Sequence, residues 1–281
     1  MIKATYHRII DRMPIGVRVG VLYFREHGSF PHLSSPRKFT EVVQNRKVYE
    51  RDRRLPKFAD KVIVKDYVRQ MLGAEWIIPT LWHGPELPPR EERSWPLPFV
   101  LKANHASGEN AFIRSESDLS WDYLEELAKT WLQETYGHRL GEWHYSEIKP
   151  QLLVEPYLGE LSVLPIDYKL WTFHGRVQLI QVDTGRATEH KRCFYSRDWI
   201  KQPFGYAYPI EPSAIERPAT LDAMIQGAEK LAAGLEFVRV DFYEINQRPL
   251  FGEMTFYPDS GTGKFTDDRI DYRLGQLWLD Q

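Results

Sequence analysis

The sequence predicts an α+β fold in which most strands come as antiparallel hairpins. Residues 167–184 alternate in hydropathy on either side of a His174-Gly175 turn, and the strand-like runs around residues 239–255 flank a second short turn. Helical periodicity appears between such strands, at residues 120–136 and 219–234. Because short turns join the strands, we favour α+β over a parallel doubly wound sheet.

Composition and charge describe an ordinary globular chain. The 281 residues suffice for one large domain or two lobes, and a formal net charge of −2 gives no reason to expect a nucleic-acid partner. The single cysteine, Cys193, excludes an internal disulfide, and no apolar run approaches the ~18–20 residues of a membrane span. We expect a cytoplasmic protein. The basic, partly apolar first 25 residues also allow a weak peripheral contact with a membrane.

The elements follow in order along the chain. Residues 1–95 read as a mostly helical region, and its end overlaps a linker with five prolines at residues 84–98. Strands are expected within the segments PFVLKANH, AFIR and PQLLVEPYLG, and a short helix is expected at the C-terminus.

Two acids occupy the last hairpin, within RVDFYEINQRPLFGEMTFYPDSG. A turn centred on Gln247 would place Asp241 opposite Glu253, with Cβ atoms ~4.5–5.5 Å apart. Two ionised carboxylates at that separation need a cation or a shared proton, and Mg²⁺ bound through carboxylates and phosphates would supply the cation. Thr255, on the same face, could ligate the metal or hold a metal-bound water. Alternatively, both acids lie on a solvated face, and a one-residue slip would separate them.

A lysine and a flexible loop come earlier in the chain. Lys102 lies inside an apolar strand, directly before a loop that contains Ser107 and Gly108. A cation on a rigid strand beside mobile backbone N–H groups suits a phosphate. Neither the P-loop order nor a GxGxxG turn is present. A strand-edge lysine beside an ordinary hairpin loop is the alternative interpretation.

Two further segments carry polar residues in apolar strands. Glu155 interrupts an apolar run before Pro156, whose carbonyl could read an adenine edge together with the N–H of Leu158. Asp167 and Lys169 share one strand face and suit a ribose hydroxyl and a phosphate. A plain strand end and an exposed ion pair explain the same residues.

The order of these features resembles the ATP-grasp superfamily, in which two α+β lobes with antiparallel sheets hold ATP between them. Several segments, above all VRVDFYEINQRPLFGEMTFYPDSG, look like its branch named after teichuronopeptide biosynthesis, and the likeness runs from about residue 37 to the C-terminus. The resemblance implies a lid lobe at residues 96–158 and a C-terminal lobe at residues 159–281, preceded by the helical region 1–95.

The resemblance also implies roles for the candidate residues. Lys102 and Lys169 would hold ATP phosphates under the loop 105–110, which includes His105, Ser107 and Gly108. Glu155, Pro156 and Leu158 would form the adenine hinge, and Asp167 would bind ribose. Asp241 and Glu253, with Thr255, would bind one or two Mg²⁺ ions, or Mn²⁺ in their place. Arg192 and Arg239 would act on the transferred phosphoryl group or an acyl phosphate, and Lys169 would take part in the same step.

Two features depart from the superfamily pattern. Many members have asparagine where this chain has Thr255, which implies that one metal is held through water or that only one binds tightly. The N-terminal region also shows no parallel α/β substrate domain.

The implied activity is ATP- and Mg²⁺-dependent ligation of a carboxylate to an amine through an acyl phosphate, with ADP as product. The branch's association with bacterial surface polysaccharides suggests small-molecule or glycan-linked substrates, such as a uronic acid and an amino acid. A kinase that phosphorylates a sugar hydroxyl is one alternative. A non-catalytic glycan-binding protein, using the nine Trp and fifteen Tyr residues as stacking surfaces, is another.

Overall fold

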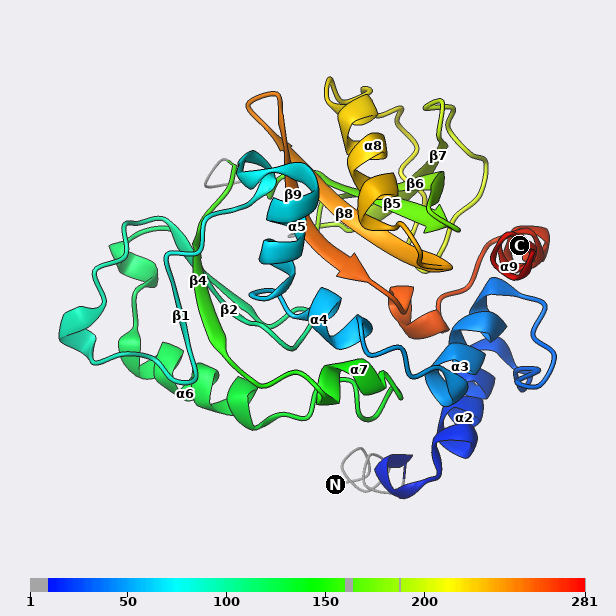
Figure 1. Cartoon of the computed structure of the whole chain (residues 1–281), viewed down its shortest axis with the longest axis horizontal. Helices are drawn as coiled ribbons and strands as arrows, with labels where there is room; N and C mark the ends of the chain where they lie inside the picture. Colours follow the sequence, from blue (N-terminus) through cyan, green and yellow to red (C-terminus); the bar gives the residue numbers. More distant parts are fainter. Residues whose placement is uncertain (1–9, 160–163, 187, 281) are drawn as a thin grey trace.

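A computed structural model describes residues 10–159, 164–186 and 188–280. Within these residues the strands form two antiparallel sheets with helices on their outer faces (Figure 1). The strands are β1 (Trp82–Gly84), β2 (Phe99–Ala103), β3 (Asn110–Ile113), β4 (Leu152–Pro156), β5 (Asp167–Phe173), β6 (Arg176–Thr184), β7 (Lys191–Ser196), β8 (Phe237–Ile245) and β9 (Arg248–Thr255). The helices are α2 (Ile15–His27), α3 (Phe39–Tyr49), α4 (Leu55–Ala59), α5 (Val64–Leu72), α6 (Trp121–Gln133), α7 (Trp143–Ser146), α8 (Leu221–Leu231) and α9 (Asp268–Leu279), with short 3₁₀ helices η1 (Ala74–Trp76), η2 (Arg90–Glu92), η3 (Glu116–Asp118) and η4 (Pro258–Gly261).

The smaller sheet has the strand order β1-β4-β2-β3. Helix α6 covers it with Leu124, Ala128 and Trp131, whose helical spacing places them on one buried face. Strand β1 lies where the sequence predicted the end of the helical region, and it pairs with β4. With only three residues, β1 is too short for a period-two pattern to indicate a strand.

The larger sheet has the order β7-β6-β5-β8-β9. Its central strand β5 is buried along its whole length, because helix α8 covers one face of the sheet and other parts of the chain cover the opposite face. Alternation then sorts the side chains: Val238, Val240 and Phe242 of β8 belong to the apolar core, whereas Arg239 and Asp241 share the opposite face. The face with Arg239 and Asp241 is charged at the cavity, whereas Trp171, which pairs with Arg239, and Phe237 continue the same face as apolar core.

The first helices share the core of the larger sheet. Phe39 of α3 packs against Trp171, Phe237 and Trp278, with distances of 5.0–5.4 Å between ring centroids. The Phe237 ring in turn lies 4.3 Å from Trp278 and 5.9 Å from Trp171. The Thr40 N–H donates to Asp271 at 2.9 Å, which joins α3 to α9 (Figure 1). Among the described residues, no helix has the length and apolar character needed to cross a bilayer.

Candidate functional site

A cavity of about 1210 Å³ lies where the two sheets face each other. Lys102 of β2 and Glu155 of β4 line it from the smaller sheet, whereas Lys169 of β5 and Asp241 of β8 line it from the larger one. Every candidate residue named from the sequence lines this cavity, with the exception of His105.

The acid pair has the predicted register, although the turn differs from the one assumed. The turn is a two-residue one, because Ile245 pairs with Arg248 around Asn246 and Gln247, both with positive φ. Continued regularly, that register would place Gly252 opposite Asp241. A β-bulge after Asp241 shifts it by one residue, so Asp241 pairs with Glu253.

Gly252 is the residue that makes this bulge fit. A Cβ atom at Gly252 would lie 3.1 Å from the carbonyl oxygen of Asp241, tighter than an ordinary contact. The glycine therefore allows the two chains to approach where the register changes, and both acids keep the same face.

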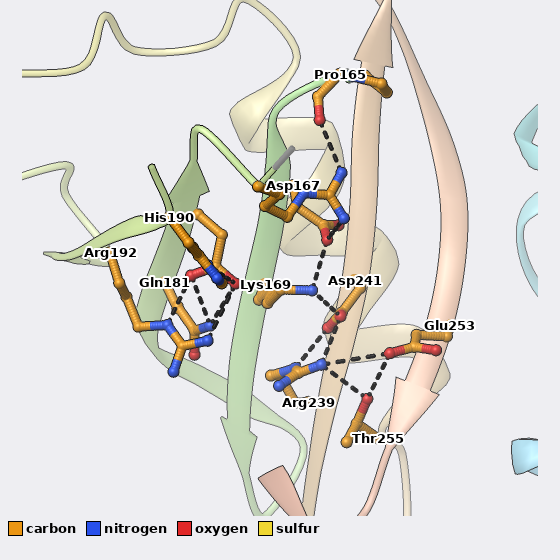
Figure 2. Close-up of polar contacts among 12 residues, drawn as sticks. Pro165, Asp167, Lys169, Gln181, His190, Arg192, Arg239, Asp241, Glu253 and Thr255 are labelled. Carbon is orange, nitrogen blue, oxygen red and sulfur yellow. Dashed lines mark hydrogen bonds and ion pairs between the residues drawn. The ribbon is translucent and has the colours of Figure 1, made fainter. Parts of the chain in front are cut away.

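Lys169 lies between two buried acids (Figure 2). Its Nζ donates to Asp167 at 2.7 Å and to Asp241 at 2.6 Å. Burial by itself lowers the pKa of Lys169, but the two carboxylates outweigh burial and the pKa is raised. Lys169 is therefore a permanent cation on the cavity face.

Arg239 links Asp241 to the neighbouring acid. It donates to Asp241 through Nε and Nη2 at 2.7 Å each, and its Nη2 lies 3.4 Å from Glu253 Oε1. Burial raises the pKa of Asp241 more than Arg239 and Lys169 lower it. The pKa of Glu253 is lowered to about 2, because Lys61, Lys169 and Arg239 together outweigh the opposing effect of burial.

The donor set fits a divalent metal that also binds a ligand's phosphates. Among the described residues, no group of three or more His, Cys, Asp or Glu side chains could hold a metal ion. Asp241 and Glu253 offer two carboxylates on one face, and Glu253 keeps 33% of its side chain exposed. Mg²⁺ needs few protein ligands when phosphates and water complete its coordination. Thr255 donates its hydroxyl to Glu253 at 3.1 Å and accepts from Arg239 at 3.0 Å, so it orients both neighbours.

The hinge strand carries a second ion-pair cluster. Glu155 is buried and bonds to Lys102 Nζ at 2.5 Å and to Lys65 Nζ. Burial opposes ionisation of Glu155, but Lys102 and Lys65 outweigh it and lower its pKa. The Glu155 carboxylate thus positions two cations.

The chain just beyond Glu155 lines the cavity with Pro156 and Leu158. The Tyr157 N–H donates to Pro98 at 3.0 Å. Because successive backbone groups of an extended chain point in opposite directions, the Pro156 carbonyl and the Leu158 N–H face away from that bond. Asp167 Oδ1 is buried and has no hydrogen-bond partner among the described residues, which suits a ligand hydroxyl. In the loop over the cavity, Gly108 has a φ of 86°, a conformation that favours glycine.

A sequence model of the family described as TupA-like ATPgrasp matches residues 41–279. The chain belongs to the TupA-like ATP-grasp family. Its two facing antiparallel sheets are the ATP-grasp fold, as the sequence predicted.

Solved structures of ATP-grasp ligases resemble this TupA-like chain at low identity. D-alanine–D-alanine ligase from Bacillus anthracis, complexed with ATP, has 15% identity and a TM-score of 0.44 over 80% of this chain and 64% of that chain. The Helicobacter pylori enzyme has 15% identity and a TM-score of 0.47, over 80% and 61%. The ATP-grasp ligase PsnB, complexed with minimal precursor, has 12% identity and a TM-score of 0.44, over 80% and 61%. The chain thus spans less than two thirds of these structures. No curated protein matches it.

One candidate of the TupA-like chain lies outside the cavity. His105 is 2% exposed, and its ring nitrogens are 3.1 Å from Asn104 Oδ1 and 3.2 Å from the Trp131 carbonyl. Burial lowers the pKa of His105, which favours the neutral ring. His105 therefore joins the loop to the end of α6, and the structure gives it no contact with the cavity.

Two lysines of the site were missed in the sequence. Lys61, in the turn before α5, and Lys65, in the first turn of α5, line the cavity, and Lys65 bonds to Glu155. In the sequence, two lysines four residues apart are equally typical of a solvated helix. Only Glu155, 90 residues after Lys65, distinguishes the two cases.

Arg192 forms a separate cluster on the β7 side. Its Nε donates to Asp183 at 2.6 Å and its Nη1 to Asp259 at 3.0 Å. The pKa of Asp183 is lowered to about 2, because Arg192 outweighs the effect of burial.

We expect Asp183→Asn to lose stability in a pH-dependent way. A carboxyl whose pKa falls from ~3.9 unfolded to about 2 folded stabilises the protein above ~pH 4, and this contribution disappears as the pH falls through the folded value. The deficit should be about 2 kcal/mol at neutral pH and should shrink toward pH ~3. Urea unfolding across this range measures it, and a deficit independent of pH would contradict the assignment.

Proposed function

We propose that this chain is an ATP- and Mg²⁺-dependent carboxylate–amine ligase that forms an acyl phosphate and releases ADP. One observation carries the proposal. Three cations, Lys102, Lys169 and Arg239, and the acid pair Asp241 and Glu253 line one cavity between the two sheets of an ATP-grasp fold. This arrangement suits a polyphosphate bound with a divalent metal.

Each group then has a separate task. Pro156 and Leu158 would bind the adenine edge, and Asp167 Oδ1 would accept from a ribose hydroxyl. Lys102 and Lys169 would bind phosphate oxygens, with Glu155 holding Lys102 in place. Asp241 and Glu253 would hold Mg²⁺, which when bound offsets phosphate charge.

The transfer step needs charge compensation and a dry site. Arg239, at 2.7 Å from Asp241, is the candidate for the transferred phosphoryl group. Arg192 lies on the β7 side of the cavity, so we place it on the substrate side. The loop with Ser107 and Gly108 would cover the phosphates and exclude water, which would otherwise hydrolyse an acyl phosphate.

The proposed substrates are a uronic acid or similar carboxylate and an amino acid or amine, joined in the cytoplasm during biosynthesis or decoration of a bacterial surface polysaccharide. The family description and the resemblance of the 239–261 segment to the teichuronopeptide branch support this context.

Incubation with MgATP, uronic acids and amines is expected to release ADP and phosphate and to give a product with the mass of an amide. Omission of either substrate should stop product formation, and EDTA should stop the reaction. Product-dependent release of AMP would contradict the acyl-phosphate route. A product that retains phosphate would instead identify a kinase, and sugar binding without nucleotide turnover would identify a glycan-binding protein.

A further inference from the structure

The cavity continues past Lys169 toward β7, on the side opposite Glu253 (Figure 2). We call this part the β7 subsite and define it by cavity-lining residues that the nucleotide and metal do not use: His190, Arg192, Tyr206, Tyr208, Asp259 and Lys264. At about 1210 Å³ the cavity exceeds the ~300–1000 Å³ typical of a small-ligand site, so a second ligand can lie beside a nucleotide.

A strained turn shapes this subsite. Ala207 has a φ of 62°, and the Tyr208 N–H donates to the Tyr206 carbonyl at 2.7 Å across it. This is the rare, strained form of γ-turn, and the Ala207 N–H holds it in place by donating to Lys264 O at 3.0 Å. The turn leaves Tyr206 in the core and Tyr208 39% exposed at the cavity.

The ring of Tyr208 is held as a platform. The His190 ring lies 3.8 Å from it between centroids at an interplanar angle of 32°, and the Arg192 guanidinium lies 4.6 Å from its centroid. Within the described part of the chain, the buried His190 Nε2 makes no hydrogen bond, and the carboxylate oxygen Asp183 Oδ2 lies 3.6 Å from it. A partly exposed aromatic ring beside a nitrogen that makes no hydrogen bond to the described residues suits a hydroxylated ring.

The charges disfavour a ligand with a free ammonium group. Asp183 and Asp259 are both bonded to Arg192, and Glu26 at the rim is paired with Arg25. Glu142 is buried beside Lys47, and both meet Ser260. By contrast, Lys264 is exposed and has no ion pair within the part of the chain that the structure describes.

We propose that the β7 subsite binds the sugar ring of an acidic saccharide, with Tyr208 as the stacking platform, His190 Nε2 as a hydroxyl partner and Lys264 as a counter-charge at the rim. The inference rests on the proposed function, because it locates the carboxylate substrate beside the nucleotide. An amino acid in the same place would bring an ammonium group, whereas Asp183 and Asp259 beside the subsite are already bonded to Arg192.

Binding of D-glucuronate, D-galacturonate, D-glucose and L-glutamate to the full chain, measured by saturation-transfer NMR, tests the subsite without requiring turnover. We expect a uronate to bind more tightly than glucose or glutamate. Tyr208→Ala should weaken uronate binding by about tenfold, whereas Tyr208→Phe keeps the ring and should change it by less than ~twofold. Lys264→Gln should weaken uronate binding by about threefold and leave glucose binding unchanged. Tyr123→Ala, an exposed tyrosine on α6, is the matched control.

Each outcome is decisive. Tighter binding of glutamate, no uronate binding, or a Tyr208→Ala variant that binds uronate as well as the parent would overturn the inference. If Tyr208→Ala forms the amide with an unchanged Michaelis constant for the uronate, the proposed subsite is overturned, whereas the proposed ligase function stands. Uronate binding that depends on Tyr208, in a protein without ligase activity, would support the subsite and overturn the proposed function.

Discussion

Replacing Asp241 with asparagine is expected to lower the rate of MgATP-dependent ADP release on the order of a thousandfold. Asp241 is the acid that meets Lys169, Arg239 and, across the bulge, Glu253. Asparagine keeps the volume but removes the charge that a divalent metal requires, and it also releases Lys169 and Arg239 from their shared acid. The Mg²⁺ concentration for half-maximal activity should therefore rise together with the loss of kcat.

Asp66→Asn is the control for this variant. Asp66 is 82% exposed and pairs with Arg69 on the surface of α5, so the same chemical change is made outside the cavity. It should leave kcat and the Mg²⁺ dependence unchanged. An Asp241→Asn variant that turns over at the parent rate at every Mg²⁺ concentration would remove Asp241 from the proposed metal site.

Replacing Lys169 with methionine is expected to cost about 3–5 kcal/mol of unfolding free energy and at least a hundredfold in kcat. The stability loss arises because Asp167 and Asp241, both buried, would lose the cation between them. The catalytic loss arises because a phosphate ligand disappears. Denaturant unfolding and ADP release measure the two effects separately.

The pH dependence distinguishes this cause from lost packing. Burial already raises the pKa of Asp241, and without Lys169 it would rise further. A buried carboxyl with a raised pKa destabilises the fold when it is ionised, above that pKa, and no longer does so once it is protonated. The loss of unfolding free energy in Lys169→Met should therefore be smaller at about pH 5 than at about pH 8. Lys169→Arg, which keeps the charge, should recover most of the stability. An equal loss of unfolding free energy at both pH values would contradict the ionic explanation. The control Lys129→Met, on α6, should show no loss of unfolding free energy.

Much of the site could be predicted because the relevant pattern is local. Alternation within β8 places Arg239 and Asp241 on one face, and the hairpin is short enough for Glu253 to be paired from sequence. The pairing was right although the assumed turn was wrong, because a two-residue turn and a bulge at Gly252 together give the same register. A bulge depends on contacts between strands, which residue periodicity does not report.

The misses have the opposite cause. His105 follows a candidate phosphate loop, yet its ring turns into the packing beneath α6. Lys65 looks like a surface helix residue until Glu155 meets it from another element. In both cases the deciding partner lies far away in sequence.

The sequence by itself therefore determined the kinds of groups in the site and the face of each strand on which they lie, because strand periodicity acts over a few residues. Only the tertiary structure decided which charge neutralises which. Lys65 meets Glu155, Lys169 meets Asp241, and Arg192 meets Asp259 only once the two sheets and η4 are assembled. The physical reason is that a buried charge is stable only beside its counter-ion, and these counter-ions come from segments that only folding brings together.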